Sequence, residues 1–350
     1  MSQVSAPPMI ELRNVTRSFG QQPDLLRRSL QGVGMARPDP QVRAVDGVNL
    51  QIAAGEVLGL VGESGCGKST LGRIAAGILP ASSGEVRWQG QPLGSLSRGD
   101  MRAGKLATQM VFQNPFAALN PRMTVSQIIG EAPFVHGIVS RADLADHVAL
   151  QMTRAGLDPS YANRYPHEFS GGQRQRIGIA RALAVNPKTL ICDEAVAALD
   201  VSIQAQILNL FMELREELGL TYLFISHDLA VVEHLSDRVA VMYLGRIVEE
   251  GPVSEIFSNP RHPYTQALLE EMPRIDLSRR GKFRALEGEL PSPLNPPSGC
   301  HFHPRCSMCE PRCKATMPQL ETVGSEHVSA CLRNAETQLA QAKVGAEVLS

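Results

Sequence analysis

One run of the chain places glycine, lysine and serine at a spacing that can hold a phosphate group. It fits the pattern G-x-x-x-x-G-K-[ST] and lies between an apolar run at 57–61 and a helix-like run at 71–76. Glycine lets the backbone curl until its N–H groups point at phosphate oxygens, and the start of a helix adds partial positive charge. The run, here called the P-loop, therefore predicts a site for a nucleoside triphosphate. Its contacting residues are Gly62, Ser64, Gly65, Cys66, Gly67, Lys68, Ser69 and Thr70.

Two of these side chains have predicted roles of their own. Lys68 reaches the β- and γ-phosphates, and the hydroxyl of Ser69 binds Mg²⁺. Kinases, GTPases, motors and transporters all use such a loop, so the P-loop alone does not identify the reaction.

A pair of acidic residues follows another apolar run, at 190–192. A carboxylate at the end of a strand can hold Mg²⁺, a role we assign to Asp193. The next residue points elsewhere and can polarise an attacking water, so Glu194 is the candidate general base. An Asp-Glu pair alone also fits a solvated acidic turn, but the P-loop upstream favours the catalytic interpretation.

A second anion-binding helix start is predicted at Ser170, Gly171, Gly172 and Gln173. One chain cannot easily bring two such helix starts to the same γ-phosphate. We therefore expect a head-to-tail dimer, in which each nucleotide lies between the P-loop of one subunit and the Ser-Gly-Gly-Gln of the other.

These motifs must be positioned by strands that alternate with helices. Strands are predicted over 9–19, 44–52, 57–61, 84–88, 106–112, 189–192, 221–225 and 238–243, and helices over 172–185 and 202–218. The alternation predicts an α/β fold with a mixed sheet and a largely parallel core. A helical pattern from 124 to about 163 predicts an inserted subdomain, and 20–43 is expected to be a loop with a short helix at 25–30.

Composition narrows the classes of function. Lys and Arg number 34 against 35 Asp and Glu, so the net charge of −1 gives no reason to expect a nucleic-acid partner. No run of 18 apolar residues and no signal peptide is found, so we expect a location where ATP is available and thiols stay reduced. Five of the seven cysteines fall between Cys300 and Cys331, and such clustering favours metal ligation over disulfides.

The order of the motifs resembles that of ATP-binding cassette (ABC) ATPases, whose signature is similar to Ser170–Gln173. The resemblance implies that Gln113 contacts Mg²⁺ and the attacking water, that His227 contacts the γ-phosphate, and that Asp200 lies in the loop crossing the dimer interface. It also implies that Phe19 stacks on adenine, although a strand-end core aromatic is the alternative. The implied catalytic residues are Glu194, His227 and Gln113, and the implied Mg²⁺ ligands are Ser69, Gln113 and Asp193.

Two positions depart from the family pattern, and two related classes are disfavoured. Ala195 and Ala197 stand where the family commonly has Pro and Ser, and the missing hydroxyl removes a hydrogen bond across the dimer worth about 1 kcal/mol. We expect the chemistry to survive while coupling between the two sites weakens. The paired acid and the signature disfavour a kinase, and the absence of an Asn-Lys-x-Asp motif disfavours a GTPase.

The end of the chain looks like the C-terminal extension of dipeptide and oligopeptide importer ATPases, on the residues 262–269, 288–293 and 295–306. This implies an ABC ATPase domain at 1–260, with the helical subdomain at about 114–180, and an extension at 261–350. It also implies peripheral attachment to the cytoplasmic face of the membrane. The implied partners are a second ATPase subunit, expected to be a paralogue, two transmembrane permeases contacted through 113–135, and an extracytoplasmic solute-binding protein.

The transported solute stays open, with dipeptides, longer peptides, nickel chelates and glycosides as alternatives. Two other functions are alternatives to transport. A soluble ABC ATPase acting on nucleic acid or ribosomes would carry a coiled-coil insertion, tandem cassettes or a basic face, and the sequence has none. A metal-dependent interaction module, with the cassette as a switch only, is the third alternative.

Four cysteines are the candidate metal ligands of the extension: Cys300, Cys306, Cys313 and Cys331. Four thiolates can hold a [4Fe–4S] cluster or tetrahedral Zn²⁺. The resemblance favours the cluster, and unligated thiols are the third alternative. Cys66 is a separate case, because a helix N-terminus can lower a thiol pKa. We favour a small filler residue at this position, and the alternative hypothesis is that alkylation of Cys66 blocks ATP binding.

Overall fold

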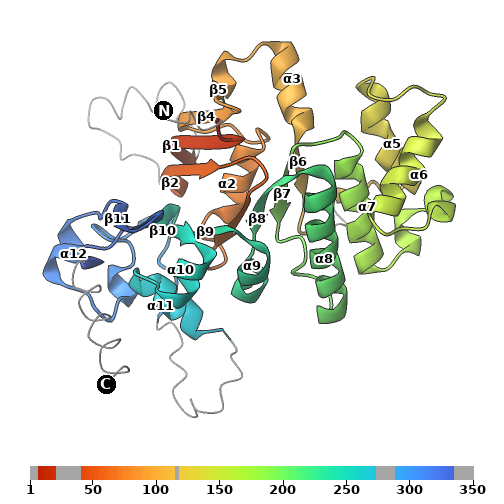
Figure 1. Ribbon diagram of the computed structural model, residues 1–350. Helices are drawn as coiled ribbons and strands as arrows, with labels where there is room; N and C mark the ends of the chain where they lie inside the picture. The colour runs from red at the N-terminus through yellow and green to blue at the C-terminus, as the bar shows by residue number, and fades with distance from the viewer. Residues whose placement is uncertain (1–6, 21–40, 115–117, 273–287, 335–350) are drawn as a thin grey trace, which may run out of the picture.

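Two β-sheets form the framework of the molecule (Figure 1). The computed structural model describes residues 7–20, 41–114, 118–272 and 288–334. The larger sheet has eight strands in the order β11-β12-β10-β9-β3-β8-β7-β6, and the smaller has four in the order β2-β1-β4-β5. The strands of the larger sheet are β3 (Val57–Val61), β6 (Thr108–Val111), β7 (Thr189–Asp193), β8 (Thr221–Ile225), β9 (Arg238–Tyr243), β10 (Arg246–Pro252), β11 (Glu321–Gly324) and β12 (His327–Ser329).

The centre of the larger sheet is parallel, from β9 through β3, β8 and β7 to β6. Every residue of β3, β7 and β8 is buried. Helices cover both faces of these strands, which explains why they are continuous apolar runs rather than alternating patterns. The predicted α/β class with a largely parallel core is confirmed.

The smaller sheet is antiparallel and packs over the helix that follows the P-loop. Its strands are β1 (Ile10–Phe19), β2 (Val42–Ile52), β4 (Ser83–Trp88) and β5 (Gln91–Pro92). Helix α2 (Lys68–Ala75) lies between the two sheets: Leu71 and Ile74 share one hydrophobic cluster with Leu12 of β1 and Leu60 of β3. This packing holds the start of α2 in place relative to both sheets.

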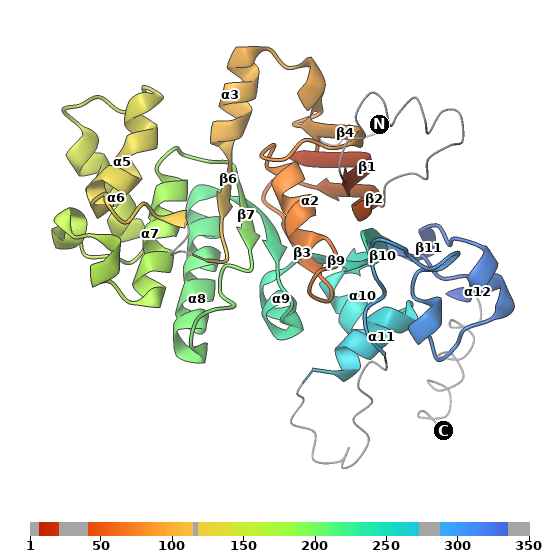
Figure 2. The same ribbon diagram turned by 180° about the vertical axis from the view of Figure 1, so that it is seen from behind.

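The helical subdomain is inserted between β6 and β7 and stands at one end of the molecule in both views (Figures 1 and 2). It comprises α5 (Val125–Val135), α6 (Leu144–Arg154), the 3-10 turns η2 (Pro159–Asn163) and η3 (Pro166–Glu168), and α7 (Gly171–Leu183). Thr124 begins α5 with a reciprocal capping box to Gln127, as a Thr-x-x-Gln sequence predicts.

The remaining helices cover the sheet or connect its strands. Helix α3 occupies the part of the chain where the predicted strand 106–112 was expected to begin, so Leu106 and Ala107 are helical and the strand starts at Thr108. The predicted loop 20–43, with its helix at 25–30, falls largely outside the described residues. The remaining helices are α3 (Arg98–Ala107), α8 (Val201–Leu218), α9 (Leu229–Leu235), α10 (Val253–Ser258), α11 (Pro263–Glu270) and α12 (Pro311–Ala315), with 3-10 turns η1 (Leu93–Ser95) and η4 (His303–Arg305).

The C-terminal part of the chain is continuous with the larger sheet. Strand β12 pairs antiparallel with β10, and β11 pairs with β12, so the extension adds two strands at one end of the sheet. Three buried aromatic rings, Tyr243, Tyr264 and Phe302, pack against one another in edge-on or tilted arrangements, with centroids 4.6 to 5.4 Å apart. The extension therefore shares a hydrophobic core with the ATPase domain. Among the described helices, none has the length and apolar character needed to span a bilayer.

Candidate nucleotide site

The P-loop joins β3 to α2 in a backbone path that two glycines make feasible. Gly62 and Gly67 have φ values of 149° and 110°, which side-chain-bearing residues rarely adopt. A Cβ at Gly62 would collide with the carbonyl oxygen of Met242, and one at Gly67 with that of Ala44. The loop is thus pressed between β9 and β2 and has no room for side chains at these two positions.

Lys68 folds back across the loop. Its Nζ donates to the carbonyl oxygens of Gly62 at 2.7 Å and Glu63 at 3.0 Å, and the side chain is buried. These two acceptors satisfy a cation that would be costly to bury alone. The ammonium group therefore lies over the loop that is predicted to receive the phosphates.

Ser69 joins the P-loop to the acidic pair. Its hydroxyl donates to Oδ1 of Asp193, the last residue of β7, at 2.7 Å. Burial raises the pKa of the Asp193 carboxyl, and the hydrogen bond from Ser69 acts in the opposite direction. The two predicted Mg²⁺ ligands are in contact because β3 and β7 end at the same edge of the parallel sheet.

Glu194 lies at the centre of the predicted catalytic group. Nε2 of Gln113, which follows β6, donates to its Oε2 at 2.5 Å, and Nδ1 of His227, which follows β8, lies 3.5 Å from its Oε1. The backbone of Glu194 has a positive φ of 47° and its N–H donates to the carbonyl of Ile225. The structure thus brings together three residues from the ends of three neighbouring strands.

The Ser170–Gln173 segment lies away from this group. Ser170 precedes α7 as its N-cap. Its hydroxyl accepts a hydrogen bond from the N–H of Gln173 at 3.4 Å, and its own N–H donates to the side-chain amide oxygen of Gln173 at 3.0 Å. In both views α7 stands beyond α8 and β7 from the P-loop helix α2 (Figures 1 and 2). The structure does not bring this segment to the P-loop of the same chain.

Asp200 lies beside the same segment and not beside the P-loop. It precedes α8, is exposed, and is followed by Val201, an apolar side chain that is 85% exposed. A Cβ added at Gly171 would contact Leu199, so the loop before α8 adjoins the start of α7. This forms a second cluster of predicted nucleotide-site residues on an open face.

Phe19 ends β1 with its ring 40% exposed, and the Arg17 guanidinium lies 4.8 Å from the ring centroid. It pairs with Val42, two residues before the Ala44 carbonyl that abuts Gly67. An exposed ring near the P-loop fits the predicted contact with adenine better than the core-aromatic alternative.

Burial of Cys66 counts against an activated thiol at this position. The side chain is 1% exposed, and burial raises the pKa of the thiol despite the nearby Lys68. A buried, protonated thiol is a poor nucleophile, so the small-filler interpretation holds for this position.

The four predicted metal ligands line one small cavity in the extension, of about 20 Å³. Burial raises the pKa of Cys300 and Cys306 to about 11 and also raises that of Cys331. Among the described residues, no group of three or more His, Cys, Asp or Glu side chains is arranged to hold a metal ion. The four thiols therefore share a cavity without being arranged as a set of metal ligands.

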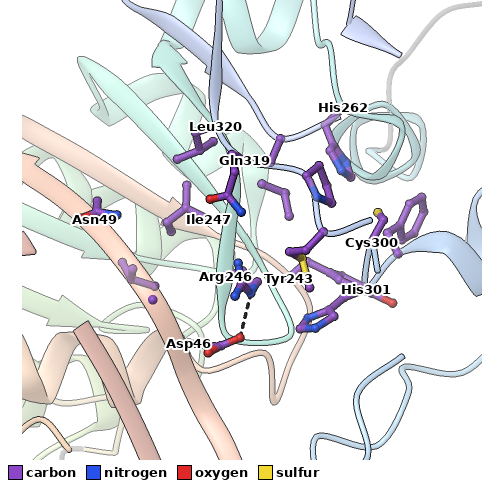
Figure 3. Close-up of a pocket in the computed structure, with 17 residues that line it drawn as sticks. Asp46, Asn49, Tyr243, Arg246, Ile247, His262, Cys300, His301, Gln319 and Leu320 are labelled. Atoms are coloured by element: carbon purple, nitrogen blue, oxygen red, sulfur yellow. Dashed lines mark hydrogen bonds and ion pairs between the residues drawn. The ribbon is translucent and has the colours of Figure 1, made fainter. Parts of the chain in front are cut away.

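A neighbouring cavity of about 190 Å³ marks the boundary between the smaller sheet and the extension (Figure 3). At its base Nε of Arg246 donates to the carboxylate of Asp46 at 2.8 Å, which ties β10 to β2. Cys300 and His301 approach from the opposite side, and burial lowers the pKa of His301. Residues of the extension therefore line this cavity together with residues of β2 and β10.

Three residues at the P-loop were missed by the motif analysis: Glu63, Tyr264 and Arg305. The N–H of Glu63 donates to the Tyr264 hydroxyl at 2.9 Å, and Nη1 of Arg305 donates to both Glu63 carboxylate oxygens, at 2.8 and 3.0 Å. The contacts span 201 and 242 positions, so no local pattern could have signalled them.

The chain is similar to known proteins along most of its length. The ABC transporter family model matches residues 45–197, and the model of the oligopeptide/dipeptide transporter C-terminal region matches 248–313. The oligopeptide transport ATP-binding protein OppF of Salmonella typhimurium is 53% identical over 301 residues, covering 85% of this chain and 90% of that protein. AppF of Bacillus subtilis, with the same description, is 48% identical over 336 residues, covering 95% and 99%.

Solved structures agree on the fold. The protein cbiO1 of Clostridium perfringens, part of the ABC transporter complex cbiONQ, has a TM-score of 0.60 at 28% identity and covers 72% of this chain and 92% of its own. A dimeric ATP-binding cassette, MJ0796 bound to ADP and Pi, has a TM-score of 0.59 at 28% identity and covers 70% and 99%.

Proposed function

The chain belongs to the ATPase subunits of ABC transporters, and from that premise we propose that it hydrolyses ATP to drive import of dipeptides, oligopeptides or a related small solute. The relatives with 53% and 48% sequence identity are described as oligopeptide transport ATP-binding proteins, and the C-terminal region matches the oligopeptide/dipeptide transporter family. Two transmembrane permeases and an extracytoplasmic solute-binding protein complete the importer, and the chain attaches peripherally to the cytoplasmic face of the membrane.

The observation that carries the proposal is the grouping of Gln113, Glu194 and His227 beside the Ser69–Asp193 contact. Lys68 and the P-loop N–H groups hold the phosphates, while Ser69, Asp193 and Gln113 are the ligands for Mg²⁺, which neutralises phosphate charge when bound. Glu194 accepts the proton of the attacking water, Gln113 orients that water, and His227 donates to the γ-phosphate. The remaining nucleotide contacts, including Phe19, are those predicted from the sequence.

A second ATPase subunit completes the site, and we propose that it is a paralogue. The separation of α7 from the P-loop within one chain supports the need for a second subunit, as does the exposed Val201 beside the Asp200 loop, and the choice of a paralogue rests on the family resemblance. In the assembled pair, Ser170, Gly171, Gly172 and Gln173 of one subunit cover the nucleotide held by the P-loop of the other, with Asp200 at the interface.

The helical subdomain is the proposed contact with the permeases. At the end of α5, Phe134 and Val135 are 46% and 67% exposed, within the predicted contact region 113–135. Exposed apolar side chains next to each other are typical of a binding surface. The division into 1–260, with its insertion at about 114–180, and 261–350 is part of the same proposal.

The finer proposal for the extension is a [4Fe–4S] cluster on Cys300, Cys306, Cys313 and Cys331, with Zn²⁺ and unligated thiols as alternatives. It is supported by the shared cavity, and the present arrangement of the thiols counts against it. Protein purified without oxygen is analysed for acid-labile sulfide, visible absorption and zinc. Labile sulfide together with visible absorption supports the cluster, and bound zinc alone supports the alternative metal. The absence of sulfide, absorption and zinc supports unligated thiols.

The substitution Glu194→Gln tests the ATPase mechanism. It removes the proton acceptor but keeps the side chain's size, so hydrolysis in the complex purified from membranes falls at least about 100-fold while ATP binding persists. ATP turnover by phosphate release and nucleotide retention by filter binding give the two readings. Near-normal turnover would refute the base assignment, and recovery of the chain from membranes without any permease would contradict the transport function.

A further inference from the structure

The outer side of the P-loop contacts the C-terminal extension through Glu63. Its carboxylate accepts two hydrogen bonds from Arg305, whose side chain is 5% exposed, while that of Glu63 is 24% exposed. Its N–H donates to the hydroxyl of Tyr264 in α11. A charged side chain and a backbone N–H of the same P-loop residue are therefore both held by residues of the extension.

The groups that hold Glu63 are themselves fixed by packing. The rings of Tyr243 and Tyr264 are fully buried, and Phe302, three residues before Arg305, packs against both. Arg305 is the last residue of the turn η4, and its backbone N–H donates to the carbonyl of Phe302. A side chain anchored in this way loses little further freedom when it binds a carboxylate, so the contact can hold a loop in place.

Glu63 also joins this contact to the phosphate-binding lysine. Its carbonyl oxygen is one of the two acceptors of Lys68, so a displacement of Glu63 moves an atom to which the ammonium group is bound. On the inner side, the N–H of Gly245 donates to the carbonyl of Cys66 at 2.8 Å, which fixes the loop against the turn between β9 and β10. The P-loop is held from two directions, one of which is the extension.

We propose that Arg305 and Tyr264 are positioning residues of the ATP site, through which the C-terminal extension sets the affinity of the P-loop for nucleotide. The inference deepens the proposed ATPase function and rests on it. Both residues act through Glu63, and neither touches the reacting atoms. Pre-ordering of the loop lowers the conformational cost of binding the phosphates, so its loss weakens ATP binding more than it slows the chemical step.

The test measures nucleotide affinity in the full-length chain and KM and kcat for ATP in the assembled complex. Arg305→Met removes the charge and keeps most of the aliphatic volume, while Tyr264→Phe removes only the hydroxyl. Each is expected to raise the Kd and KM about three- to tenfold and to leave kcat within about twofold. Arg305→Lys keeps the positive charge but loses the planar guanidinium, and it is expected to fall between wild type and Arg305→Met.

Two further variants separate positioning from stability. Arg312 forms an exposed ion pair with Glu310 in the same extension, so Arg312→Met is the matched control and should leave the Kd unchanged. Glu63→Gln combined with Arg305→Met should weaken binding no more than the stronger single variant, because both remove one interaction. Thermal unfolding of each variant shows whether any loss of affinity follows from a loss of fold.

The proposal is overturned if Arg305→Met and Tyr264→Phe bind ATP as wild type does, or if the two substitutions at Glu63 and Arg305 weaken binding independently. It is also overturned if Arg312→Met weakens binding equally. If the wild-type complex hydrolyses ATP, such results reject the positioning role and leave the proposed ATPase function standing. A wild-type complex without ATPase activity rejects the proposed function instead.

Discussion

The P-loop and the start of α7 both present backbone N–H groups at a helix N-terminus, yet their surroundings differ. Lys68 and Ser69 are satisfied within the chain, by loop carbonyls and by Asp193, and Glu63 is held by the extension. Ser170 is exposed, its hydroxyl accepts from the N–H of Gln173 within the capping box, and the neighbouring Val201 is 85% exposed. The first region is ordered by its own chain, whereas the second presents an open face that fits a partner subunit.

The largest change in ATP turnover that separates the two regions is expected from a substitution at Ser170. Ser170→Ala removes a hydroxyl proposed to bind the partner's nucleotide, so kcat of the complex should fall about ten- to hundredfold. Binding of ATP to the isolated chain should not change, because the P-loop is untouched. Phosphate release and equilibrium binding measure the two quantities.

Loss of a helix cap is the competing cause, worth about 1 kcal/mol. Ser97 caps α3 by the same contact, a hydroxyl accepting from the N–H three residues on, and Ser97→Ala is the matched control. Equal losses of kcat in both variants would assign the effect to helix stability and remove the distinction between the two regions.

A second effect, on stability rather than turnover, is expected from pH on the region that supports the P-loop. His262 caps α11 with a neutral Nδ1 that accepts from the N–H of Tyr264, and burial lowers its pKa to about 4 from 6.5, against the opposing charge of Glu249. As the pH falls, His262 is protonated in the unfolded chain before it is protonated in the folded chain. The contribution of the neutral histidine to the free energy of unfolding is therefore complete above about pH 6.5 and is lost as the pH falls toward 4. The loss amounts to about 3 kcal/mol of unfolding free energy.

The substitution His262→Asn checks this pH dependence. Asparagine can cap the helix but does not titrate, so the difference in stability between wild type and variant should shrink or reverse from pH 7 to pH 4. Urea unfolding at a series of pH values measures it, with His234→Asn, at an exposed histidine of α9, as the control. Parallel pH profiles for wild type and His262→Asn would contradict a buried, neutral histidine.

The smallest effect is expected at the open face. Ala197 is exposed, so Ala197→Ser fits the fold and restores the hydroxyl common in the family. A new hydrogen bond across the dimer is worth about 1 kcal/mol net, or about fivefold in ATP-dependent association of the ATPase subunits. Light scattering or sedimentation with ATP measures it, and an unchanged association constant would mean that this position lies away from the interface.

The elements predicted best are those whose signal is local. The buried strands β3, β7 and β8 and the helices α7 and α8 lie within a few residues of the ranges predicted, because apolar runs and capping residues are read from neighbouring positions. The order in which β3, β8, β7 and β6 pair was not predicted, and it is this order that places Asp193, Gln113 and His227 at one edge. Pairing depends on contacts between distant segments.

The environment of Cys66 has the same physical origin. A helix N-terminus alone would lower the thiol pKa, but tertiary packing buries the sulfur and raises that pKa, which favours the small-filler interpretation. The cysteines of the extension show a related difference: their spacing indicated ligation, whereas their present arrangement is that of separate thiols round one cavity.

The sequence by itself determined the residue types of the ATP site, because the P-loop, the acidic pair and the Ser-Gly-Gly-Gln segment each need only neighbouring residues to be recognised. The separation of α7 from the P-loop of the same chain agrees with the dimer expected from the sequence, whereas only the tertiary structure decided that Arg305 and Tyr264 hold Glu63. The physical reason is that a motif is made of local spacing, whereas a contact across 242 positions exists only when the packed core brings its two ends together.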